Sequence, residues 1–194
     1  MTDFCEKCDK PKSICVCTDE PPVENDHFVL ILQHPQEQDK LLGTAKIITN
    51  RLKNAQLEVA LSRPGLNQIL KRPVDPKKWG VLYLGAQKEK PIASGLYVLD
   101  KSGKIVPDFQ NILAELEGII LLDGSWDQAK KLWWRNPWLL KVRRLVLVPE
   151  KKSMYGKLRK EPRRESVSTL EATAFCLEKL GKLGRIFLFE LLDK

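Results

Sequence analysis

Short apolar runs and amphipathic segments alternate along most of the chain. The runs at residues 27–32, 79–84 and 118–122 are almost continuously apolar, which is typical of strands buried on both faces of a parallel sheet. Residues 45–52 instead place their apolar positions on one face of a helix. This alternation predicts an α/β domain with three layers around a mainly parallel sheet.

The remaining elements continue the same alternation toward the C-terminus. We expect further strands at 57–61, 144–148 and 185–190, and helices at 108–117, 127–134 and 170–180. Residues 96–99 suggest a hairpin or short edge element, and residues 64–78 are rich in loops with one short helix. Residues 18–26 are acidic and interrupted by proline, as in a linker. We therefore divide the chain into an N-terminal module with its linker, residues 1–26, and a main domain, residues 27–194.

Four of the five cysteines lie in the N-terminal module. Cys5, Cys8, Cys15 and Cys17 stand close together in a segment with few apolar residues. This arrangement predicts a structural zinc ion bound by four thiolates, because a metal can order a segment that cannot build its own core. Disulfide bonds are the alternative, and the lack of a secretory signal weakens it. The fifth cysteine, Cys176, lies in a helical pattern and is expected to be a small buried apolar residue.

The composition is that of a soluble globular protein. Hydrophobic residues make up 43% of the chain and charged residues 30%, and no apolar run approaches the roughly 20 residues that a membrane helix needs. The N-terminus has acids and cysteines where a signal peptide has a basic and then an apolar segment. We therefore expect a cytoplasmic protein without membrane contact, and we expect it to be a monomer.

The charge of the chain favours an anionic partner. The formal net charge is +8, and basic side chains crowd the segment 151–164, which also contains a tyrosine and a proline. A basic segment that proline interrupts and that carries an aromatic residue is more typical of a phosphate-contacting loop than of a solvated helix face. Nucleic acid is therefore the partner class that the charge predicts.

The most distinctive motif, Asp123-Gly124-Ser125-Trp126, follows the apolar run at 118–122. Ser125 can cap the next helix, and Gln128 three residues later completes a capping box. An acid and a tight glycine turn thus stand where a strand ends and a helix begins, which is where ligands bind in open α/β sheets. An ordinary strand-to-helix turn is the alternative interpretation.

Other polar groups are predicted to share this edge of the sheet. His34 and Glu37 follow the strand at 27–32, and a second capping box joins Ser168 to Glu171. Asp123 can act there as a base or hold a cationic group. Trp126 can stack on a flat ring such as adenine or uracil, or pack against the neighbouring tryptophans.

Taken in order, the motifs resemble those of the DTW-domain family over nearly the whole chain. They are Cys-x2-Cys-x6-Cys-x-Cys, His34-Pro35-x-Glu37, Thr44-Ala45, Asp123-Gly124-Ser125-Trp126, Ser153-x-Tyr155, Arg159-x-Glu161-Pro162 and Ser168-Thr169-Leu170-Glu171-Ala172. Ser125 stands where the family has the threonine of its name. This change keeps the capping hydroxyl and loses a methyl group.

The resemblance implies a reaction and a fold. Bacterial members of the family are tRNA-uridine aminocarboxypropyltransferases, which move the 3-amino-3-carboxypropyl group of S-adenosylmethionine to N3 of a tRNA uridine and release 5′-methylthioadenosine. It also implies a SPOUT-like fold with a knotted C-terminal region, an exception to the rule against knots. Under this interpretation the substrate is tRNA, the cofactor is S-adenosylmethionine, and residues 27–194 form the catalytic domain.

The resemblance also assigns roles to individual positions. The catalytic residues would be Asp123, Trp126 and Glu171, with Asp123 the first candidate for the base and Glu171 or Glu37 the alternatives. The cofactor would lie against Leu84, Gly85, Ala86, Leu122, Asp123, Gly124, Ser125, Ser168, Thr169 and Leu170. RNA would be contacted by His34, Arg51, Tyr155, Arg159, Arg163 and Arg164.

Two other classes of protein remain open on the sequence alone. A methyltransferase of the same fold would use the same cofactor and release S-adenosylhomocysteine. A zinc protein that only binds RNA would show salt-sensitive RNA affinity without binding the cofactor. The second alternative leaves the gathering of acidic, small and capping residues at one edge of the sheet unexplained.

Overall fold

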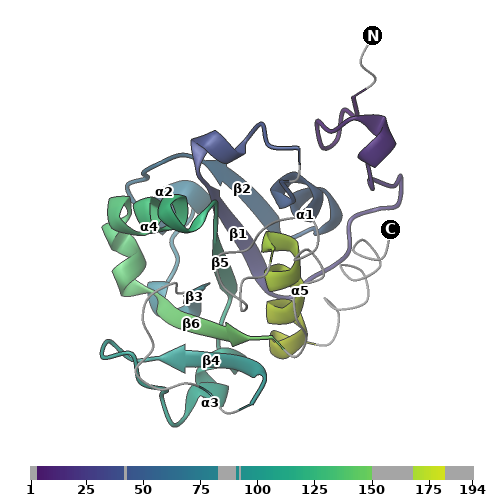
Figure 1. Ribbon diagram of the computed structural model, residues 1–194. Coiled ribbons are helices and arrows are strands. Elements are labelled where there is room, and N and C mark those ends of the chain that lie inside the picture. Colours follow the sequence, from purple (N-terminus) through teal and green to yellow (C-terminus); the bar gives the residue numbers. More distant parts are fainter. Residues whose placement is uncertain (1–3, 42, 83–90, 92, 150–167, 182–194) are drawn as a thin grey trace.

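The structure is a computed structural model, and it describes residues 4–41, 43–82, 91, 93–149 and 168–181. Its centre is a six-stranded sheet with the order β2-β1-β5-β3-β6-β4 (Figure 1). The strands are β1 Phe28–Gln33, β2 Ala55–Val59, β3 Trp79–Leu82, β4 Gly95–Leu99, β5 Gly118–Asp123 and β6 Arg143–Val148. All neighbours are parallel except β4, which pairs with β6 in the antiparallel sense at the edge. The predicted mainly parallel sheet is confirmed.

Helices cover the sheet on both sides. The α-helices are α1 Ala45–Arg51, α2 Leu66–Leu70, α3 Phe109–Ala114, α4 Trp126–Arg135 and α5 Thr169–Leu180, and the 3-10 helices are η1 Lys12–Ile14, η2 Pro35–Glu37, η3 Pro76–Lys78 and η4 Pro137–Lys141. In Figure 1, α1 and α5 lie on one side of the central strands, and α2 and α4 lie on the other.

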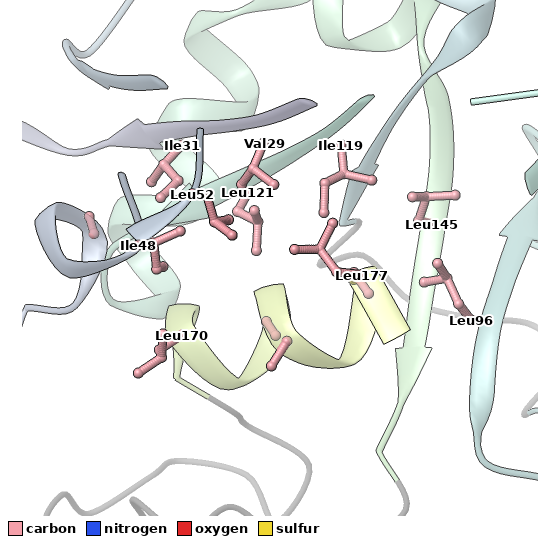
Figure 2. Packing of buried hydrophobic residues seen from close by; sticks show 14 of the residues in the cluster. Val29, Ile31, Ile48, Leu52, Leu96, Ile119, Leu121, Leu145, Leu170 and Leu177 are labelled. Carbon is pink, nitrogen blue, oxygen red and sulfur yellow. The ribbon is translucent and has the colours of Figure 1, made fainter. Parts of the chain in front are cut away.

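The core has two halves because successive strand residues face opposite sides of the sheet. Val29 and Ile31 of β1 join the cluster beneath α1 and α5, which also contains Leu170 and Leu177 of α5, and Figure 2 shows Leu177 directed toward the strands. Leu30 of β1 belongs instead to the cluster that contains residues of α2 and η4. Burying one such side chain stabilises the fold by about 1.5–3 kcal/mol. The near-continuous apolar runs in the sequence therefore reflect burial on both faces.

Most described elements match the sequence prediction to within one residue at each end, and two differ by more. The strand expected at 57–61 begins at Ala55 and ends at Val59, where its partner β1 ends at Gln33. The helix expected at 108–117 ends at Ala114, and the Glu117 N–H already donates to the Lys78 carbonyl, 2.7 Å away. Contacts with segments that are distant in the sequence therefore set the end of β2 and the end of α3.

Some expectations lie outside the described residues. They are the strand at 185–190, the basic segment from 151 to 164, and most of the C-terminal region that the resemblance expects to be knotted. Within the described part of the chain, none of the helices combines the length and the apolar character required to span a bilayer.

Candidate functional site

The carboxyl ends of β1 and β5 meet at one edge of the sheet. Gln33 and Asp123, the last residues of these strands, stand opposite each other in the parallel register. The His34 N–H then donates to the Asp123 carbonyl oxygen, 3.0 Å away. The sheet therefore brings the motif around Asp123 next to the segment that begins at His34, as the strand pattern predicted.

Two side chains donate hydrogen bonds to the Asp123 carboxylate, one to each oxygen. Gln33 Nε2 lies 2.7 Å from Oδ2, and the Thr169 hydroxyl donates to Oδ1. Asp123 is only 8% exposed, so these donors replace most of the water around its carboxylate. They hold the carboxylate in one orientation, and each oxygen keeps lone pairs that can accept a further proton or hydrogen bond.

Gln33 was not predicted as a site residue. Its Nε2 faces the carboxylate of Asp123, which fixes the orientation of the amide because an ionised carboxylate only accepts. Its Oε1 is buried and has no hydrogen-bond partner among the residues that the structure describes. A buried acceptor without a partner costs about 1–3 kcal/mol, so the site keeps an unsatisfied acceptor beside its acid. A polar residue at the end of an otherwise apolar strand was the available signal.

Two helices begin at this edge, and both predicted capping boxes are confirmed. Ser125 Oγ accepts from Gln128 N, and Gln128 Oε1 accepts from Ser125 N at 2.6 Å. At α5, Ser168 Oγ accepts from Glu171 N at 3.1 Å, and Glu171 Oε2 accepts from Ser168 N at 2.7 Å. The other N–H groups of each first turn have no partner within their helix, which makes both N-termini favourable places for an anion.

Gly124 is required by the close packing of this turn. A Cβ at this position would lie 2.8 Å from the Cβ of Gln128 and 3.5 Å from that of His34. The first distance is shorter than real Cβ contacts allow, so any larger residue would push α4 away from β5. The glycine thus lets the helix start directly at the end of the strand.

The segment after β1 carries polar groups to the same place. His34 is buried, and its Nδ1 accepts from the Gln36 N–H at 3.2 Å, so the proton of the neutral ring lies on Nε2. Glu37 is also buried and pairs with Lys40. Gln36 Oε1 accepts from Gln128 Nε2 at 3.4 Å, which joins this segment to the first turn of α4.

The described site residues differ in how their side chains are used. Leu170 points into the core and is 2% exposed, so only its backbone can face a ligand. Glu171 is 2% exposed, and its carboxylate serves the capping box. Leu122 and Trp126 are half-buried. Seven predicted residues lie outside the described part of the chain: Leu84, Gly85, Ala86, Tyr155, Arg159, Arg163 and Arg164.

Arg51 has a structural role that the sequence did not suggest. Its side chain is 6% exposed, and its guanidinium donates to Thr18 Oγ1 at 2.7 Å and to Glu20 Oε2 at 2.9 Å. The side chain is thus directed toward the N-terminal segment. The backbone adds to this contact, because Val23 N donates to the Arg51 carbonyl at 2.7 Å. RNA contact by Arg51 stays a prediction.

The four N-terminal cysteines form a second candidate site. The sulfur atoms of Cys5, Cys8, Cys15 and Cys17 all lie within 4.8 Å of one another, and Cys8 and Cys15 are 3.7 Å apart. A tetrahedral zinc site with Zn–S bonds of 2.3 Å places its sulfurs about 3.8 Å apart. All four are free thiols in the structure, so the disulfide alternative finds no support. The sulfur positions fit a metal such as zinc.

Hydrogen bonds already favour the thiolate form at one of these sulfurs. Hydrogen bonds from the Cys15 side chain and from the backbone of Cys8 and Lys7 lower the pKa of Cys5 to about 7. Burial raises the pKa of Cys17 well above its usual range. A dication would compensate this second effect, because it stabilises every thiolate bound to it.

The cysteine segment is attached to the main domain at α1 and at the loop after η2. Asp9 pairs with Lys46, and Asn50 donates to the Lys7 carbonyl. Lys10 is buried and donates to the carbonyl oxygens of Lys40 and Leu41, and the loss of water around its ammonium lowers its pKa. The loop that Lys10 holds is the one that follows His34 and Glu37.

Comparisons with known proteins were made for the whole chain. The family model described as "DTW domain" matches residues 2–191. A tRNA-uridine aminocarboxypropyltransferase 2 of Macaca fascicularis is 26% identical to this chain, in an alignment that covers 92% of this chain and 56% of the relative. The tRNA-uridine aminocarboxypropyltransferase 2 of Drosophila melanogaster is 28% identical, in an alignment that covers 91% of this chain and 66% of the relative. The tRNA-uridine aminocarboxypropyltransferase A of Arabidopsis thaliana is 26% identical, in an alignment that covers 90% of this chain and 71% of the relative.

The chain thus spans about half to two thirds of the length of the first two relatives. No solved structure matches it.

Proposed function

We propose that this chain, which belongs to the DTW domain family, is a tRNA-uridine aminocarboxypropyltransferase. Its donor would be S-adenosylmethionine, and the acceptor would be N3 of a uridine in tRNA. The observation that carries the proposal is the Asp123 carboxylate, held by Gln33 and Thr169 at the edge where α4 and α5 begin.

The reaction asks this site to perform two tasks. N3 of the uridine attacks the γ-carbon of the methionine moiety, the bond from that carbon to the sulfonium sulfur breaks, and its electrons leave with 5′-methylthioadenosine. The proton on N3 has to leave as the new bond forms. The cofactor must therefore present its γ-carbon and not its methyl group to the uridine, and a base must stand beside N3.

Asp123 is the residue that we assign as this base. A carboxylate held by two donors keeps its orientation while it receives the proton, which is a requirement of general base catalysis. The Glu171 carboxylate is occupied by its capping box, and that of Glu37 pairs with Lys40, so each is less available. Holding a cationic group of the cofactor is the other role open to Asp123.

The two helix N-termini suit the rest of the cofactor. Its carboxylate would lie at the first turn of α4 or α5, near Ser125 or Thr169, where the N–H groups of the first turn and the helix dipole favour an anion. Trp126, half-buried at the start of α4, would contact the adenine or the uridine ring. Leu84, Gly85 and Ala86 follow β3, the strand next to β5, and would complete the cofactor site.

The remaining assignments concern the module, the fold and the partner. The cysteine segment, residues 1–26, would hold a structural zinc ion beside the catalytic domain, residues 27–194. The C-terminal region would complete a SPOUT-like knot. His34, Tyr155, Arg159, Arg163 and Arg164 would contact the tRNA, and we expect the enzyme to be a cytoplasmic monomer.

Nucleoside analysis tests the proposed reaction. The chain is incubated with S-adenosylmethionine and unmodified tRNA, and the tRNA is then digested to nucleosides for mass spectrometry. We expect a uridine that has gained one aminocarboxypropyl group. A uridine that has gained a methyl group would indicate the methyltransferase alternative, and unmodified nucleosides together with salt-sensitive tRNA binding would indicate a protein that only binds RNA.

A further inference from the structure

The outer face of α4 carries the most exposed large apolar side chain in the described part of the chain. Trp134 is 78% exposed, while the next in order, Leu41, is 59% exposed. Its neighbour Trp133 is half-buried and packs against the core, with the Arg144 guanidinium 5.9 Å from the centre of its ring. The packing of α4 therefore uses one of two adjacent tryptophans and leaves the other in solvent.

Basic side chains surround this tryptophan. Lys130 and Lys131 stand four and three residues before Trp134, which places them beside it on the helix surface, and Arg135 follows it. All three are exposed. Lys130 lies 3.9 Å from Asp127, and both side chains are largely solvated, so this contact neutralises little of the basic charge.

We infer that this α4 outer face, made of Lys130, Lys131, Trp134 and Arg135, binds the tRNA backbone and stacks one base on Trp134. An exposed aromatic ring among cationic side chains is the combination with which proteins hold unpaired nucleotides, because the ring stacks on a base and the cations neutralise phosphates. A hydrophobic protein partner would instead favour an apolar surround, which these residues do not provide.

The position of this surface links it to the proposed reaction, on which the inference rests. The first turn of α4 belongs to the candidate site, and Trp134 lies eight residues after Trp126. That separation is about 12 Å along the helix, or the rise of three to four stacked nucleotides. The α4 outer face would therefore hold nucleotides near the reacting uridine and not the uridine itself.

Binding of unmodified tRNA to the full chain tests this inference. We expect Trp134→Ala to raise the Kd for tRNA about tenfold, because stacking of one base on an aromatic ring strengthens binding by roughly 5- to 150-fold. Trp134→Phe retains a ring and should recover most of the affinity. Lys131→Ala should weaken binding less and should also lower the salt dependence of the Kd. The midpoint of thermal unfolding and the affinity for S-adenosylmethionine should stay unchanged in all three variants.

Leu140→Ala is the matched control, because Leu140 is also exposed and apolar and lies in the next element, η4. It should bind tRNA like the wild type. If the wild type binds and modifies tRNA while Trp134→Ala does so equally well, the inference is wrong and the proposed function stands. If the wild type does not bind tRNA, both fail. A dimer that Trp134→Ala converts to a monomer in sedimentation, with tRNA binding intact, would assign the surface to a second copy of the chain and also overturn the inference.

Discussion

The sheet edge around Asp123 and the N-terminal cysteine segment hold their functional atoms in different ways. Asp123 ends a strand of the core, and its two hydrogen-bond donors come from β1 and α5, elements that the hydrophobic core fixes. The cysteine segment contains one 3-10 helix and no other regular element among residues 4–26. The conformation of the cysteine segment depends on the grouping of its four sulfur atoms and on contacts with α1 and the loop after η2. The first site should therefore survive changes that disrupt the second.

The largest expected effect concerns the acid itself. Asp123→Asn keeps the shape of the side chain and removes the base, so we expect the rate of transfer to tRNA to fall by about 10²–10⁴-fold. The rate is measured in single-turnover experiments with saturating S-adenosylmethionine. Asp127→Asn is the control, because Asp127 is an exposed acid four residues later, on α4, and should be dispensable.

The binding of the cofactor separates the two roles of Asp123. Normal affinity of Asp123→Asn for S-adenosylmethionine with a lost rate supports the base, while lost affinity supports a contact with the cofactor. A variant that binds the cofactor normally and modifies tRNA at the wild-type rate would refute the assignment.

Removing one donor from Asp123 should have a smaller effect. Gln33→Leu removes the hydrogen bond to Oδ2, so the carboxylate of Asp123 is held less firmly. We expect the rate of transfer to fall by about tenfold, with the affinity for S-adenosylmethionine unchanged. Gln110→Leu, an exposed position on α3, serves as the control. A rate equal to that of the wild type would mean that Gln33 does not position the carboxylate.

Removing metal should affect the cysteine segment and leave the sheet edge in place. After treatment with a chelator, Cys5 should react with iodoacetamide at about pH 8, because a thiol with a pKa of about 7 is largely thiolate at that pH. Cys176 should not react, since burial raises its pKa to about 12. Mass spectrometry of peptides reports both sites. Alkylation of Cys5 at the same rate before and after chelation would argue against a bound metal.

The smallest expected effect is at the contact between the two regions. Lys10→Met keeps the length of the side chain and loses the hydrogen bonds to the carbonyls of Lys40 and Leu41. We expect faster amide hydrogen exchange in residues 35–43 and a loss of stability of about 1 kcal/mol. Lys101→Met, at an exposed turn, should change neither quantity. Unchanged exchange in residues 35–43 would show that the cysteine segment does not support the loop.

The features that the sequence predicted well are local. The capping boxes at Ser125 and Ser168 each depend on residues three positions apart, and the strands were marked by their apolar runs. The contacts from Gln33 and Thr169 to Asp123 join residues separated by 90 and 46 positions, so no local pattern could indicate them. The burial of Arg51 was hidden for the same reason, because its partners belong to the N-terminal segment.

Identification of the by-product tests the central claim most directly. Purified chain, S-adenosylmethionine and unmodified tRNA are incubated together, and the small molecules are separated and quantified beside the modified uridine. Transfer of the aminocarboxypropyl group predicts 5′-methylthioadenosine in equal amount to the modified uridine. Both products should form far more slowly when Asp123→Asn replaces the wild type. S-adenosylhomocysteine in its place, or methylthioadenosine that forms equally without tRNA, would contradict the proposed function.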